Sequence, residues 1–179
     1  MIEACETLVK AAVMAPSGDN RQPWRFELDP SAGRVTLLLD AARDPSPMNA
    51  GQRMSRIACG AALENMLRTA RRNGWNARIL PGASAQACTI ELDHVKPDCV
   101  EDEALERRVT NRHIYEGRQA PPEVLARLYA ATPRLDGVVT CWMTERPARE
   151  AFAQIEAKAF EHMYGEATLR RAIDLARAE

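Results

Sequence analysis

Two polar stretches of the sequence carry residue types that could form hydrogen bonds or ion pairs with a ligand. The first is APSGDNRQPWRF, residues 15–26, which places Ser17, Asn20 and Gln22 between two prolines. The second is RRVTNRHIY, residues 107–115, which spaces arginines around a threonine. Amide side chains both donate and accept hydrogen bonds, and guanidinium groups bind phosphate, often through two hydrogen bonds. These residue types could therefore form the wall of a binding site.

Both stretches also allow a simpler structural interpretation. Pro, Ser, Gly, Asp and Asn are ordinary turn residues, so Asn20 could merely cap a turn. Arg107, Arg108 and Arg112 could lie at a solvated helix end, and this is the interpretation we favour for Arg107. The aromatic residue that follows the first stretch, Trp24, is expected to be a core anchor.

Composition limits the kinds of partner. The chain has 179 residues and a net charge of −1, which gives it no electrostatic reason to bind nucleic acid or an anionic membrane. No apolar run is long enough to span a bilayer, and charged residues interrupt the first stretch, so no signal peptide is expected. The five cysteines form no C-x-x-C pair, and the three histidines lack ligand spacing. We therefore expect free thiols, a cytoplasmic protein and no metal site.

Hydrophobic periodicity predicts helices that alternate with short strands. Helices are expected at residues 2–14, 53–73, 101–109, 121–131 and 148–178, the last with a break near Gly165. Strands are expected at residues 24–28, 35–39, 77–80, 88–92 and 138–143, the first two forming a hairpin. Within 53–73 the expected apolar cluster consists of Met54, Ile57, Ala58, Ala61, Met66, Leu67 and Ala70. The sequence therefore predicts an α+β fold whose mixed or mostly antiparallel sheet is flanked by helices.

The first polar stretch resembles the A-P-S-x-x-N-x-Q-P-W-x-F loop of the FMN-dependent nitroreductase family. CGAALENMLRTARRNGW, residues 59–75, is similar to the family's following helix, which carries G-x-A-x-x-N-x-x-L-x-A and ends at a glycine. The family usually begins with R-R-S-x-R, which holds the FMN phosphate and ring edge, but no such motif precedes Ala15. The R-x-[ST]-x-R pattern falls instead on Arg108, Thr110 and Arg112.

The displaced arginine motif, taken with the resemblance, implies an internal duplication. Residues 1–105 resemble one nitroreductase half that has the polar loop, and residues 106–179 resemble the start of a second, degenerate and truncated half. Where a second polar loop would fall, the chain reads TPRLDGVVTCW, which keeps only Pro133 and Trp142. This arrangement is similar to the double-length branch of the family. The family's late Gly-Gly-Arg phosphate contact is not visible in the sequence.

The resemblance implies a three-layer nitroreductase-like fold with FMN as cofactor. The side chains implied to contact FMN are Pro16, Ser17, Asn20, Gln22, Arg108, Thr110 and Arg112. No catalytic side chain is expected, because a flavin itself carries the hydride. The implied activity is NAD(P)H-dependent reduction of a nitroaromatic or quinone acceptor by ping-pong chemistry.

Other functions stay open at this level. The chain could be a catalytically inactive flavin-binding or flavin-sequestering module, or an accessory domain of a larger protein. It could also lack a ligand and act only through a protein partner. In the family two subunits share each flavin site, which implies a homodimer or association with a missing second half. Apolar residues along 148–178 also predict association; they are Phe152, Ile155, Ala159 and Met163.

Overall fold

The computed structural model divides the chain into two compact units, residues 1–110 and residues 111–179. It describes residues 1–80, 86–93, 104–111, 113, 119–163 and 165. The first unit contains α1 (Ile2–Ala12), β1 (Trp24–Asp29), β2 (Arg34–Leu39), α2 (Arg53–Arg72), β3 (Asn76–Leu80), β4 (Ala87–Asp93) and α3 (Ala104–Arg107). Short 3₁₀ turns lie at Gly18–Asn20, Ala41–Arg43 and Pro47–Gln52. The second unit contains α4 (Pro122–Ala131) and α5 (Arg146–Met163).

The sheet of the first unit has the strand order β1-β2-β4-β3, and every neighbouring pair is antiparallel. The predicted hairpin is confirmed, with Trp24 opposite Leu39 and Asp29 opposite Arg34. All four predicted strands of this unit form, each within two residues of its predicted ends. The α+β fold with an antiparallel sheet and helices is therefore confirmed.

The two faces of this sheet differ sharply in polarity. Val35 lies opposite Ile90 in the register, and both side chains are fully buried. The next residue on each strand points to the other face, because side chains alternate along a strand. There Thr36 and Thr89 bond to each other through their hydroxyl oxygens, 3.0 Å apart. One face therefore forms the core and the other carries polar groups.

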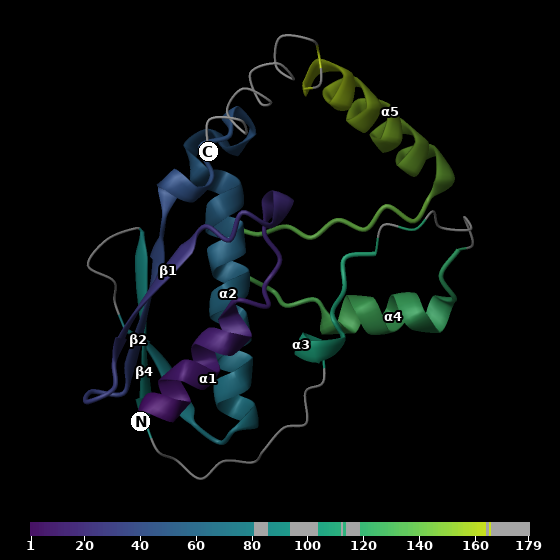
Figure 1. Ribbon diagram of the computed structural model, residues 1–179. Coiled ribbons are helices and arrows are strands. Elements are labelled where there is room, and N and C mark those ends of the chain that lie inside the picture. Colours follow the sequence, from purple (N-terminus) through teal and green to yellow (C-terminus); the bar gives the residue numbers. More distant parts are fainter. Residues whose placement is uncertain (81–85, 94–103, 112, 114–118, 164, 166–179) are drawn as a thin grey trace. The chain divides into compact units, whose positions relative to one another are not determined.

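Helices α1 and α2 cover the apolar face and complete a second layer (Figure 1). Leu8 of α1, Met66 of α2 and Ile90 of β4 are among the largest fully buried side chains. Much of the remaining core is alanine, at positions 4, 12, 15, 58, 62 and 70. Because alanine fills little volume, the two helices and the sheet must approach closely to exclude water.

The buried face of α2 differs from the predicted one. Ile57 and Met54 are 74% and 42% exposed, although both were expected in the apolar cluster. The buried residues of α2 are Ser55, Ala58, Ala62, Asn65, Met66, Thr69 and Ala70. Hydrophobicity misassigned this face because three of its members are polar, and the side chains of two of them, Ser55 and Asn65, are buried with hydrogen-bond partners.

The second unit confirms one predicted helix closely and corrects one predicted strand. Helix α4 begins at Pro122, in agreement with its double proline, because a first-turn proline loses no helical hydrogen bond. The predicted strand at 138–143 is wrong: these residues have no regular secondary structure. A strand needs a neighbour for its backbone groups, and no described strand pairs with this segment.

Two further predicted helices are found in part. Only Ala104–Arg107 of the helix predicted at 101–109 is helical, with 101–103 outside the described residues. Helix α5 begins two residues before the predicted start at 148 and reaches Met163, while the end of that prediction lies outside the described residues. No helix in the described ranges combines the length and the apolar character that crossing a membrane requires.

A three-residue ionic cluster ties three strands together on the polar face of the sheet. Arg34 donates to one oxygen of Glu91 through Nε at 2.9 Å and through Nη2 at 2.7 Å. Arg78 donates to the other oxygen. Arg34 and Arg78 lie opposite Glu91 in the two ladders, so the cluster spans β2, β4 and β3. The bonds from Arg78 and Arg34 lower the pKa of Glu91.

We expect the stability difference between wild type and Glu91→Gln to depend on pH. Because the pKa of Glu91 is lowered in the folded state, its ionised carboxylate stabilises the fold above the unfolded pKa. That contribution is lost as pH falls through the folded pKa. Urea unfolding should therefore show that the variant is less stable than wild type at pH 7. The difference in unfolding free energy between the two should narrow below about pH 4.

Glu27→Gln is the matched control, because Glu27 forms only a long, exposed ion pair with Arg25 at 3.9 Å. It should leave the urea midpoint almost unchanged, since such pairs contribute little. A gap for Glu91→Gln that is the same at every pH would contradict the role assigned to the carboxylate.

Candidate functional site

The polar loop begins where α1 ends. The amides of Met14 and Ala15 donate to the carbonyls of Ala11 and Ala12 at 3.2 and 3.0 Å, which closes the helix with a tight turn. From α2, the buried Asn65 donates through Nδ2 to the same Ala11 carbonyl at 3.0 Å. Asn65 therefore has a structural role between the two helices. The loop therefore starts from a fixed point, with Ala15 buried and Pro16 exposed.

Hydrogen bonds within the loop fold it back on itself. Ser17 is half-buried, and its Oγ accepts from the backbone N–H of Gln22 at 3.0 Å. The Ser17 carbonyl accepts from the N–H of Asn20 at 3.1 Å, and the Gln22 carbonyl accepts from that of Trp24 at 2.8 Å. Ser17, Asn20 and Gln22, all predicted site residues, are thus brought together in one small loop.

Three non-glycine residues of this loop have positive φ. The values are 46° at Asp19, 57° at Asn20 and 48° at Gln22. Asp and Asn tolerate this region, but glutamine has no such preference, and each L-residue held there costs about 1–2 kcal/mol. Strained backbone persists where the surrounding structure enforces it, and it clusters at ligand-binding sites. The loop therefore has a feature that a simple turn does not need.

The end of the loop is held as firmly as its start. The Pro23 carbonyl accepts from the N–H of Asp40 at 3.1 Å and from Cys59 Sγ of α2 at 3.5 Å. Trp24, which follows, is 4% exposed and belongs to the core cluster, so its predicted role as a core anchor is confirmed. Both ends of the loop are consequently fixed to α2.

A buried polar cluster organises the start of α2, and sequence reasoning missed it. Asn49 is 2% exposed, and its Oδ1 accepts from the N–H groups of Met54 and Ser55 at 3.0 and 3.4 Å. Its Nδ2 donates to the Asp44 carbonyl, to Gln52 Oε1 and to Ser55 Oγ. Asn49 thus satisfies amides that the first turn of a helix leaves without partners. An Asn shortly before a strong helical pattern was the available signal.

Arg108 lies beside the entrance of the polar loop. Its Nη2 donates to the Met14 carbonyl at 3.0 Å, one residue before Ala15. This bond uses one N–H of a guanidinium group that carries several. Thr110 is exposed in the same unit, and Arg112 lies outside the described residues. Of the two described residues of the arginine motif, Arg108 is hydrogen-bonded beside the loop.

The described donors fit a ligand with polar ring edges and a phosphate. Asn20 is exposed and Gln22 half-exposed, and their side chains make only a long contact of 3.5 Å with each other. The Ser17 hydroxyl oxygen accepts a bond, so its hydrogen can still be donated. Arg108 adds a cation at the loop's entrance. These groups match the chemistry that FMN would require.

A small cavity between the sheet and α2 lies apart from the predicted site residues. Its volume is about 230 Å³, and it is lined by Leu37, Leu39, Arg56, Cys59, Gly60, Leu63, Gln86, Ala87 and Cys88. Burial raises the pKa of Cys59 to about 11 and also raises that of Cys88, so both are protonated thiols at neutral pH. Within the described ranges no group of three His, Cys, Asp or Glu side chains could hold a metal ion.

Comparison with known proteins finds relatives in Mycobacterium tuberculosis. No family model matches the chain. Two relatives, from strains CDC 1551 and H37Rv, are each named putative NAD(P)H nitroreductase. Each is 28% identical over 179 residues, which cover 94% of this chain and 49% of the relative. The chain therefore spans about half the length of these two curated relatives.

Two further matches are more limited. An uncharacterized protein of Mycobacterium tuberculosis is 31% identical over 93 residues, which cover 52% of this chain and 11% of that protein. Among solved structures, a putative NADH oxidase from Clostridium acetobutylicum matches with a TM-score of 0.41 and 21% identity, over 66% of this chain and 89% of the other.

The strain at Gln22 can be measured with two substitutions. At an ordinary helix or strand position glycine is less stable than alanine by about 0.5–1 kcal/mol. At Gln22 we expect the reverse: Gln22→Gly should be more stable than Gln22→Ala by about 1 kcal/mol, because only alanine keeps a Cβ at positive φ. Both variants remove the same polar side chain, so its loss cancels in the comparison. Chemical denaturation measures the difference, and an alanine variant at least as stable as the glycine variant would rule out strain at this position.

Proposed function

We propose that the chain binds FMN at the loop of residues 16–23 and contributes to an NAD(P)H-dependent oxidoreductase of nitroreductase type. One observation carries this proposal: the loop holds three non-glycine residues at positive φ, and Arg108 is hydrogen-bonded at its entrance. Similarity to the two relatives named as nitroreductases supports it.

Each residue of the proposed site has a distinct role. The amides of Asn20 and Gln22 bond to the nitrogen and carbonyl groups at the ring edge, with Ser17 and the backbone beside Pro16 next to them. Arg108 binds the phosphate, together with Thr110 and Arg112 of the same motif. A fixed loop makes this recognition efficient, because little conformational freedom is left to lose on binding.

FMN, when bound, supplies the hydride chemistry, and the protein positions its substrates. In the proposed ping-pong cycle, NAD(P)H gives up a hydride and NAD(P)⁺ leaves before the acceptor enters. A quinone acceptor then gains two electrons and two protons to become a hydroquinone, and a nitroaromatic is the other proposed acceptor. We assign no side chain to proton transfer. Free thiols at Cys5, Cys59, Cys88 and Cys141 support a cytoplasmic location.

An FMN titration of the chain, followed by flavin fluorescence, tests this proposal. We expect saturable binding that Arg108→Ala weakens about 10- to 100-fold, because a hydrogen bond to a charged group contributes about 1.5–3 kcal/mol. Arg108→Ala/Arg112→Ala should weaken it further. Arg107→Ala removes the same charge one residue away and is the matched control. If FMN does not bind, or if Arg107→Ala weakens binding as much as Arg108→Ala, the assignment of the site is wrong.

Turnover then separates the enzyme from the alternative of a non-catalytic flavin-binding module. Fold resemblance does not choose between them. The alternative is supported by the exposure of the loop amides, because no described cavity encloses them. Oxidation of NAD(P)H by the flavin-loaded chain with a quinone would support the enzyme. Tight flavin binding without turnover would favour the non-catalytic module.

We also propose that residues 106–179 belong to a second, degenerate nitroreductase-like half and that the chain forms a homodimer. The split of the chain into two units and the greater length of the relatives support the duplication. Phe152, Ile155 and Phe160 of α5 are 44%, 64% and 56% exposed, and such apolar surface favours association.

Light scattering on the pure chain tests the proposed assembly. We expect a mass of two chains that shifts toward one chain in Ile155→Glu, because a charge in an apolar contact is costly. Lys158→Glu, three residues along the same helix, is the control for a new charge on an already polar side chain. A clean monomer for the wild type would exclude the homodimer.

A further inference from the structure

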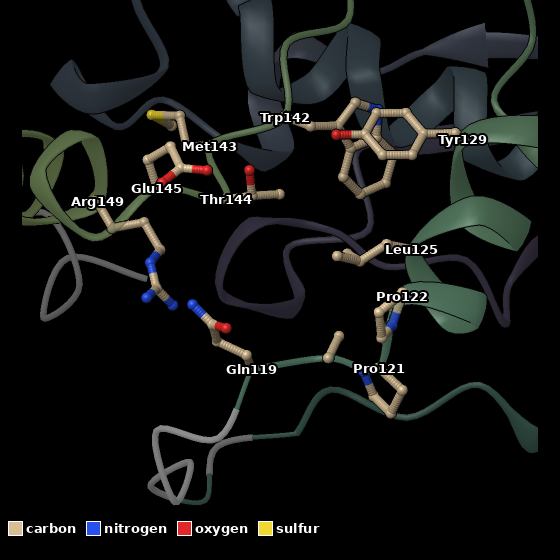
Figure 2. Close-up of a pocket in the computed structure, with 11 residues that line it drawn as sticks. Gln119, Pro121, Pro122, Leu125, Tyr129, Trp142, Met143, Thr144, Glu145 and Arg149 are labelled. Carbon is tan, nitrogen blue, oxygen red and sulfur yellow. The ribbon is translucent and has the colours of Figure 1, made fainter.

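A cavity of about 610 Å³ has all of its described lining residues in the second unit, and none of the described residues among the proposed FMN contacts lines it. It is formed by residues 119–122 before and at the start of α4, by one side of α4, by residues 142–145, and by the first turn of α5 (Figure 2). This volume falls in the range of pockets that bind small organic molecules. The side chains that line the cavity indicate which class of molecule it would bind.

One side of the cavity is an aromatic and aliphatic wall. The rings of Tyr129 and Trp142 lie 5.1 Å apart between centroids and are tilted by 57°. Leu125 and Pro122 continue this wall along α4 (Figure 2). Aromatic pairs at this separation favour a further ring packed against a face or an edge. This wall suits a planar aromatic ligand.

The other side of the cavity carries hydrogen-bond donors. Figure 2 shows the guanidinium of Arg149 and the amide of Gln119 close together, on the side away from the aromatic wall. In the described part of the chain no carboxylate pairs with Arg149, whereas Arg146 donates through Nε to Glu150 at 2.7 Å. Arg149 also lies in the first turn of α5, where the helix dipole favours negative charge. An acceptor with negative charge would satisfy both groups.

Among the described residues that line the cavity, Glu145 is the acidic one, and its charge opposes an anion. Figure 2 places it on the side of Met143 and Thr144, away from Gln119. Removing the charge of Glu145 should therefore strengthen the binding of an anionic ligand and weaken that of a cationic one.

We propose that this cavity binds a small aromatic carboxylate. The ring packs against Tyr129, Trp142 and Leu125, and the carboxylate accepts hydrogen bonds from Arg149 and Gln119. A guanidinium and a carboxylate form paired, charge-assisted bonds, so Arg149 selects the anion while the aromatic wall selects a flat ring.

Calorimetric titration of the full chain with 2-naphthoate and with the neutral 2-naphthamide tests this proposal. We expect naphthoate to bind about 10-fold more tightly or better, since bonds to a charged group are stronger than neutral ones. Arg149→Gln should abolish this preference and leave naphthamide binding unchanged. Arg146→Gln makes the same charge change on the same helix, outside the cavity, and should retain the preference. Glu145→Gln should strengthen naphthoate binding.

A second set of variants separates the wall from the anion-binding groups. Trp142→Leu should weaken naphthoate and naphthamide by the same factor, because both present the same ring. Circular dichroism of each variant verifies that α4 and α5 still form. Equal binding of the two ligands by the wild type would overturn the proposal, because the cavity would then have no preference for the carboxylate. Equal losses of naphthoate affinity in Arg146→Gln and Arg149→Gln would also overturn it, because the preference would then come from the general charge of the protein.

FMN is itself an aromatic anion, so one measurement distinguishes it from a free aryl carboxylate. Naphthoate affinity that is unchanged at saturating FMN supports a site for the carboxylate alone. Displacement of naphthoate by FMN, in proportion to FMN bound, would show that the cavity takes flavin and would contradict the proposal. The naphthoate measurements do not depend on Arg108. A negative result for the cavity would therefore leave the proposed FMN site at the loop untouched.

Discussion

The buried hydrogen bond from Asn65 to the Ala11 carbonyl is the contact on which the polar loop depends. It ties the last turn of α1, where carbonyls run out of helical partners, to the middle of α2. Two further residues of α2 then meet the loop: Cys59 bonds to the Pro23 carbonyl, and the Met54 methyl lies so close to Gly18 that a Cβ there would be 2.7 Å away. Helix α2 thus holds the start, middle and end of the loop.

Alanine makes this arrangement possible. Ala58, Ala62 and Ala70 are almost completely buried, and α2 packs on α1 and the sheet through them. Small side chains bring backbones close, so a side chain as short as asparagine can reach a carbonyl on the neighbouring helix. A core of larger residues would separate the helices and leave the buried Asn65 amide without this partner, which is costly. The alanine-rich composition is therefore a condition for the fixed loop.

The sequence predicted the elements of the first unit well and its contacts less well. Alternating residues around Trp24 and Val35 identified the strands, because one face of the sheet is buried and the other polar. The position of Asn49 before a strong helical pattern could have indicated a cap, but its other contacts could not be predicted, because those partners come together only in the folded loop. Ile57 was misplaced because apolar character alone does not say which face of α2 meets the sheet. The segment 138–143 has strand-like residues but no described strand to pair with.

The two units differ in how far their large apolar side chains are exposed to water. The first buries Leu8, Met66 and Ile90 completely. In the second, α4 has no buried residue, and large apolar side chains such as Ile155 are more than half exposed. Isolated helices of this length are marginal in water, because most helical stability comes from packing an apolar face. Unlike the first unit, the second therefore needs a further surface to cover its apolar side chains.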